Sequence, residues 1–130
     1  MTEPEFLEID VVLFMHDQAL REYGGAHGAQ KEDLLHSALS RPMNKLAYGD
    51  PETIDLYDLA AAYANGLVSN HAFTDANKRT AWSVCSLFLK LNGARIEAPV
   101  SEIIETVVGL AARQIDEAGF AAWLRSRRVD

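Results

Sequence analysis

The sequence predicts an all-α fold, a compact single-domain bundle of about six helices around a central apolar helix. In six segments the apolar residues recur at steps of three and four, which is the period of a helix with one buried face. No alternating pattern longer than a few residues indicates a strand, either near Phe6 or at residues 95–97. With 130 residues, of which 48% are hydrophobic, the chain suits one domain spanning residues 1–130.

The overall composition limits the classes of partner. A net charge of -7, from 19 acidic against 12 basic residues, argues against direct binding of nucleic acid or of anionic membranes. The single cysteine, Cys85, lies in the apolar run 81–91, which indicates a buried thiol and a reducing compartment. Residues 1–5 are acidic where a secretory signal is basic, and no apolar stretch reaches the length of about 18 residues that a membrane span requires. We therefore expect a cytoplasmic protein with no membrane segment.

The first two helices are expected on either side of a glycine-rich loop. The first covers about residues 9–22 and ends at residues 23–25, because glycine tolerates the left-handed conformation that closes many helices. Together with Gly28, these glycines are interpreted as a C-cap and loop, since their spacing does not match a dinucleotide-binding fingerprint. The second helix is expected at 31–39 and to stop before Pro42, because proline disfavours a helical residue ahead of it.

The remaining helices follow an expected exposed connector at residues 43–51. The third is predicted to start at Thr53, a favourable N-cap, and to end near residue 69. In the fourth, at about 77–92, apolar residues cover almost the whole circumference, so this helix is predicted to be the central one. Two further helices are expected at 101–114 and 116–127.

The segment between the third and fourth helices begins a helix with two cations, Lys78 and Arg79. Cations are disfavoured in a first turn, where the helix dipole is already positive, by roughly a few tenths of a kcal/mol each. A phosphate would compensate them, because the first amides of the helix and the two side chains would donate hydrogen bonds to its oxygens. Alternatively, both side chains extend into water and pair with acids such as Asp75. These two residues alone leave both interpretations open.

Neighbouring residues add the other groups that phosphoryl or nucleotidyl transfer requires. His71 is a candidate general base, because the imidazole of histidine can accept a proton from an attacking hydroxyl. Asp75 offers an oxygen ligand for Mg²⁺ carried with a nucleotide, and Asn77 suits either a phosphate oxygen or an N-cap. Taken singly, each also fits a structural role as a loop, turn or cap residue. Their clustering within nine residues favours a transferase site.

Residues 71–79 resemble the Fic/Doc signature, His-x-Phe-x-Asp/Glu-Gly/Ala-Asn-Gly/Lys-Arg, at every defined position. The Doc branch is the more similar, because Ala76 and Lys78 stand where adenylylating Fic enzymes usually have glycine. Further similarity at residues 23–25 and 88–93 extends the resemblance over about 6–123, nearly the whole domain.

The resemblance implies a helical bundle whose central helix follows the signature. It implies that His71 activates a target hydroxyl, that Asp75 holds Mg²⁺, and that Asn77, Lys78 and Arg79 bind the phosphates of ATP. Doc toxins are associated with transfer of the γ-phosphate to a threonine of elongation factor Tu, which stops translation. Fic relatives transfer AMP instead, so AMP transfer is the alternative reaction on the same fold.

Control of the site is expected to come from another chain. Residues 101–105 approach the Ser/Thr-x-x-x-Glu-Gly/Asn inhibitory pattern of many Fic proteins, but Thr106 follows them. The resemblance therefore implies a separate small antitoxin, similar to Phd, that inhibits in trans. A catalytically silent antitoxin-binding module stays open as a different class. A metal hydrolase is weaker, because no further His, Asp or Glu cluster has ligand spacing.

Overall fold

The fold was obtained as a computed structural model, which describes residues 3–25, 31–71 and 76–129. Within these residues the only extended pairing is one isolated antiparallel bridge between Ile96 and Arg128. The prediction of an all-α fold is confirmed. The helices are α1 (Ile9–Tyr23), α2 (Glu32–Tyr48), α3 (Leu56–Asn70), α4 (Asn77–Leu91), α5 (Val100–Ala111) and α6 (Glu117–Ser126).

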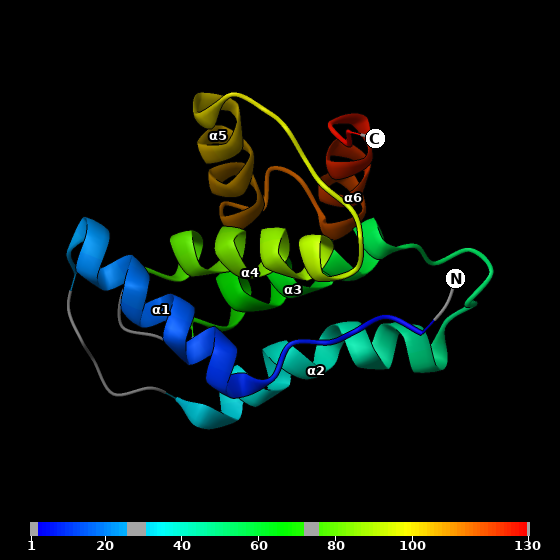
Figure 1. The fold of residues 1–130 in the computed structure, drawn as a ribbon, viewed down its shortest axis with the longest axis horizontal. Helices are drawn as coiled ribbons and strands as arrows, with labels where there is room; N and C mark the ends of the chain where they lie inside the picture. Colours follow the sequence, from blue (N-terminus) through cyan, green and yellow to red (C-terminus); the bar gives the residue numbers. More distant parts are fainter. Residues whose placement is uncertain (1–2, 26–30, 72–75, 130) are drawn as a thin grey trace.

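Helix α3 occupies the centre of the bundle. It packs against α2, α4, α5 and α6, whereas α4 packs against α1, α3 and α5. Figure 1 shows α2 on one side of the α3–α4 pair and both α5 and α6 on the other. Every residue of 59–68 except Asn65 is buried, whereas Leu91 at the end of α4 is 48% exposed. The central apolar helix is therefore α3 rather than α4, because its alanines and Gly66 let neighbouring helices approach closely.

Helix α2 continues through Pro42, so its predicted end at residue 39 is wrong. Proline has no amide hydrogen, which leaves the carbonyl of Ala38 without its helical donor. Gly66 of α3 lies directly against this carbonyl, since a Cβ added at Gly66 would stand 3.1 Å from the Ala38 oxygen. Pro42 is buried in α2, and packing of α2 on α3 thus maintains the helix past the proline. Residues 43–48, expected as a connector, are helical, and the turn begins only at Gly49.

Helix α3 begins two residues later than Thr53 would place it. Its N-cap is Asp55, whose side chain accepts a hydrogen bond from the amide of Asp58 at 2.9 Å. The side chain of Asp58 accepts in turn from the amide of Asp55 at 3.0 Å. This reciprocal capping box satisfies two amides, whereas the Thr53 hydroxyl donates to the carbonyl of Asp50 in the preceding turn.

The other helix ends follow local sequence signals. Helix α1 closes at Gly24, with φ 77°, as predicted; Gly28 lies outside the described residues. Helix α4 starts at the predicted residue, and α6 is capped by Asp116, whose side chain accepts from the amide of Gly119 at 2.7 Å. Helix α5 ends at Ala111, three residues before the predicted end.

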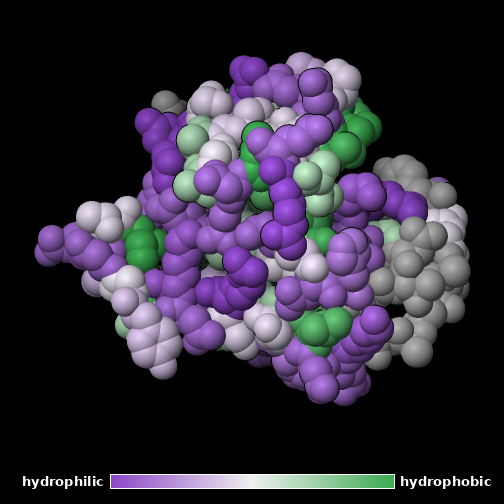
Figure 2. All heavy atoms as spheres, turned by 180° about the vertical axis from the view of Figure 1, so that it is seen from behind, coloured by the Kyte–Doolittle hydropathy of each residue, from purple (hydrophilic) through white to green (hydrophobic). Residues whose placement is uncertain are grey.

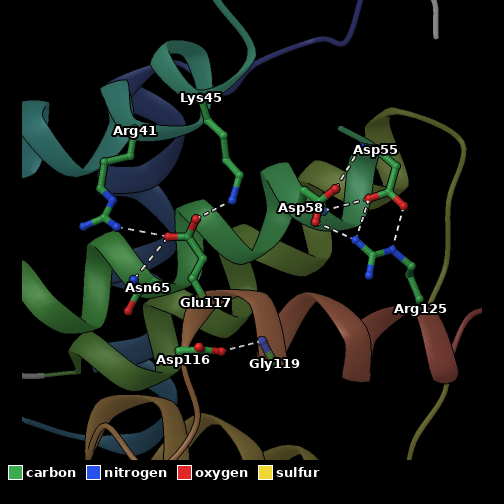
Figure 3. Close-up of polar contacts among 9 residues, drawn as sticks. All are labelled: Arg41, Lys45, Asp55, Asp58, Asn65, Asp116, Glu117, Gly119 and Arg125. Carbon is green, nitrogen blue, oxygen red and sulfur yellow. Dashed lines mark hydrogen bonds and ion pairs between the residues drawn. The ribbon is translucent and has the colours of Figure 1, made fainter. Parts of the chain in front are cut away.

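Two ionic clusters join α6 to α2 and α3 (Figure 3). The carboxylate of Glu117 accepts hydrogen bonds from Arg41 at 3.0 Å and Lys45 at 2.6 Å on α2, and from Asn65 at 3.1 Å on α3. Burial would raise the pKa of Glu117, but the hydrogen bonds from Lys45 and Asn65 outweigh it and hold that pKa below its usual value. The second cluster is formed by Arg125, which donates to Asp55 at 2.7 Å and also bonds Asp58. The same two carboxylates therefore cap α3 and attach α6 to it.

The interior is apolar, and the surface is mostly polar. Cys85 is fully buried, as the sequence indicated, and this burial raises the pKa of its thiol far above the usual value. On the face drawn in Figure 2, hydrophobic residues form separate small patches among hydrophilic ones. An apolar row on α5 is exposed, comprising Val100, Ile104 and Val108. None of the described helices is both long and apolar enough to cross a membrane.

Candidate active site

The signature segment joins the end of α3 to the start of α4, and its two flanking residues have unusual backbone conformations. His71 is the C-cap of α3, with φ 49° and ψ 50°, and Ala76 is the N-cap of α4, with φ 65° and ψ 22°. Both are left-handed, which costs a residue other than glycine roughly 1 kcal/mol or more and is often found at functional sites. Phe73 and Asp75 lie outside the described residues, so the structure does not place the predicted Mg²⁺ ligand.

His71 is exposed at the end of α3. An imidazole in this place is accessible to a hydroxyl group of another protein. This accessibility is what a general base for a protein substrate requires.

The first turn of α4 contains no acidic residue and carries the two predicted cations. Lys78 is exposed, while Asn77 and Arg79 are half-buried. The N-cap position belongs to Ala76, which has no side-chain acceptor, so the capping role considered for Asn77 is not the one observed. A helix start with cations, no acidic residue and an alanine at the N-cap suits the polyphosphate of a nucleotide.

Arg79 contacts the end of α1. Its two terminal nitrogens donate hydrogen bonds to the carbonyl oxygens of Ala19 and Gly24, each at 3.1 Å. Arg79 therefore contacts α1 instead of extending only into water, while Asp75, the acid considered as its partner, lies outside the described residues. A guanidinium at the C-terminal end of a helix is favourable, because the dipole places partial negative charge there. These main-chain partners of Arg79 were not predicted. Every residue has a carbonyl oxygen, so the sequence does not show which carbonyls will accept its hydrogen bonds.

Two buried groups adjoin this contact. Ala76 is only 6% exposed and forms a small apolar cluster with Ala19 and Leu20 of α1. Thr80, one turn into α4, is fully buried, and its hydroxyl has no hydrogen-bond partner among the residues that the structure describes. Sequence reasoning missed Thr80, because a threonine at that position also suits an ordinary helix.

The described residues were also searched for a metal-binding cluster and for a pocket. No three His, Cys, Asp or Glu side chains gather in metal-binding geometry within the described ranges. An open pocket of about 540 Å³ lies between the α4–α5 loop and the start of α5. Its lining consists of Ile96, Glu97, Ala98, Pro99 and Ile103, so it does not include a signature residue.

Comparison with known proteins identifies the family. The model of the Fic/DOC family matches residues 6–89, a range that contains α1 to α3, most of α4 and the whole signature. The chain belongs to the Fic/Doc family. It is 32% identical to "Protein kinase doc" of Escherichia phage P1 over 115 residues, 88% of each chain. It is 36% identical to "Toxin Doc" of Mycolicibacterium smegmatis over 104 residues, 78% of this chain and 79% of that protein. The predicted membership of the Doc branch is confirmed, and the family implies use of a nucleotide.

Proposed function

We propose that this chain is the toxin of a toxin–antitoxin pair and transfers the γ-phosphate of ATP to a threonine hydroxyl of a protein. The class, a Doc-type toxin with kinase-type transferase activity, follows from the family and from the two relatives. The target we propose is elongation factor Tu in the cytoplasm, so that translation stops. The observation that carries this proposal is the acid-free first turn of α4, with Lys78 exposed, at one end of a segment whose other end is the exposed His71.

His71 is assigned the role of general base. It accepts the proton of the attacking threonine hydroxyl while the hydroxyl oxygen bonds to the γ-phosphorus. The bond between that phosphorus and the bridging oxygen of ADP breaks, and ADP leaves. The exposure of His71 allows a folded protein substrate to approach it.

The first turn of α4 is assigned to the phosphates. Asn77, Lys78 and Arg79 would donate hydrogen bonds to phosphate oxygens and balance their charge, in line with the dipole of α4. Asp75 would hold Mg²⁺, which neutralises phosphate charge when it is bound. The first turn of α4, which contains cations and no acidic residue, is thus suited to bind an anion.

The relatives imply a toxin–antitoxin system with an antitoxin. We propose that this antitoxin is small and Phd-like, and that it folds a segment onto the chain and blocks the site in trans. The residues closest to an inhibitory pattern, Ser101 and Glu105, are both exposed on α5. They belong to an ordinary helix, which agrees with inhibition from outside the chain.

A labelling comparison tests the reaction. Purified protein is incubated with a bacterial lysate and ATP labelled at either the γ- or the α-phosphate. We expect one lysate protein to take up γ-label and none to take up α-label. Uptake of α-label alone would mean AMP transfer. If the His71→Ala variant still inhibited growth in cells, the protein would act as a catalytically silent binding module instead.

A further inference from the structure

The end of α1 holds the arginine of the signature. The carbonyl oxygens of Ala19 and Gly24 each accept a hydrogen bond from a different terminal nitrogen of Arg79. A guanidinium is planar and rigid, so two such bonds fix its orientation as well as its position. The orientation of Arg79 therefore depends on where α1 places two main-chain carbonyls.

Gly24 sets one of these carbonyls through its backbone conformation. Its φ of 77° and ψ of 177° belong to a region that is essentially restricted to glycine. A Cβ added at Gly24 would meet no atom of the described residues within 4 Å, so close contact with them does not explain the glycine. Glycine is required at this position because of its backbone angles. With these angles the Gly24 amide donates to the carbonyl of Leu20 and closes α1, and the Gly24 carbonyl points to Arg79.

Helix α1 contacts the signature segment at a second residue, Ala76. Ala76, the N-cap of α4, packs against Ala19 and Leu20, three positions before Arg79 in the same segment. The end of α1 thus contacts both Ala76, the N-cap of α4, and Arg79 in its first turn. Helix α1 therefore acts on the geometry of the proposed phosphate site through two main-chain carbonyls and through its packing on Ala76.

We propose that Gly24 is a positioning residue for nucleotide binding: its carbonyl, together with that of Ala19, orients the guanidinium of Arg79 toward the phosphates of ATP. The inference rests on the proposed function, in which Arg79 binds phosphate. Orientation before binding raises affinity, because less conformational freedom is lost when the nucleotide arrives.

The test compares Gly24→Ala with Gly93→Ala. Gly93 also has a positive φ, 82°, ends a helix, and would place a Cβ in open space, so both substitutions strain the backbone. Gly93 follows α4 at its opposite end and has no bond to Arg79. The KM for ATP and the dissociation constant of ATP with Mg²⁺ are measured, together with the thermal midpoint of unfolding. We expect Gly24→Ala to raise both ATP constants about tenfold, the equivalent of one hydrogen bond to a charged group, and Gly93→Ala to leave them unchanged.

A double variant tests whether Gly24→Ala changes ATP binding through Arg79. Lysine cannot present two fixed N–H groups to two carbonyls, so Arg79→Lys should weaken ATP binding by itself. Adding Gly24→Ala to Arg79→Lys should then change ATP binding no further. Equal ATP constants for the Gly24 and Gly93 variants would overturn the inference, as would full additivity of the double variant. If the unsubstituted protein did not bind ATP, the proposed function would fail first, and the inference with it.

Discussion

Gly66 of α3 lies against the carbonyl of Ala38 of α2, the carbonyl that Pro42 deprives of its helical donor. A Cβ at Gly66 would stand 3.1 Å from that oxygen and 3.2 Å from the Cα of Ala38. The two backbones approach closely only because the residue is glycine. This contact lets a proline remain inside a helix that packs on the centre of the fold.

Gly66→Ala should therefore destabilise the protein, even though alanine favours helices. The neighbouring backbone must move by a few tenths of an ångström, and such overpacking typically costs about 1–3 kcal/mol. The free energy of unfolding in urea measures this cost. Gly109→Ala is the matched control: it lies in α5, its Cβ would have its nearest neighbour at 3.8 Å, and we expect a gain of roughly 0.5 kcal/mol. Equal effects of the two variants would contradict the close contact.

Glu117 should make stability depend on pH. The pKa of Glu117 is lower in the folded protein than in the unfolded chain. Its contribution to the free energy of unfolding is therefore complete above the unfolded-state pKa of about 4.3, and it is lost as the pH falls through the folded-state pKa. Glu117→Gln should cost about 1–2 kcal/mol at pH 7, and the difference from the unsubstituted protein should shrink by pH 3. Urea unfolding at both pH values measures this. Glu105→Gln, at an exposed position of α5, should show no such change, and a constant difference for Glu117→Gln would refute the assignment.

Replacement of His71 by asparagine should abolish transfer and preserve the fold. Asparagine tolerates the left-handed conformation of residue 71 but cannot serve as a base near neutral pH. Loss of a general base typically lowers the rate by about 10²–10⁴-fold. The rate of γ-label transfer and the urea midpoint are measured, with His36→Asn, at an exposed position of α2, as control. A fully active His71→Asn variant would remove His71 from the chemistry.

Asp75→Ala should abolish transfer and weaken the Mg²⁺-dependent part of nucleotide binding. The reason is the loss of the carboxylate oxygen that we assign to the metal. ATP affinity is measured with and without Mg²⁺, and far-ultraviolet circular dichroism should show unchanged helical content. If Mg²⁺ still enhanced binding to the same degree, Asp75 would not be a ligand.

Most helices could be predicted because the decisive signals are local. The end of α1 depends on Gly24 itself, and the start of α4 on Asn77 and the change of pattern after it. The errors arose where local signals compete with distant ones. Pro42 is a strong local signal against a helix, yet Gly66, 24 positions along the chain, makes room for it. Thr53 and Asp55 are both favourable N-cap residues. Asp55 caps α3 because it also forms hydrogen bonds with Asp58 and Arg125.

The sequence by itself determined the helical class, the family, and the types of residue at the proposed site, because periodicity and a contiguous signature are properties of short segments. Only the tertiary structure decided that α3 is the central helix, that His71 is exposed, and that Arg79 is held by Ala19 and Gly24. These relationships join residues up to 60 positions apart through main-chain carbonyls and close packing. Every residue has the same carbonyl group, so its partner becomes evident only when the chain is folded.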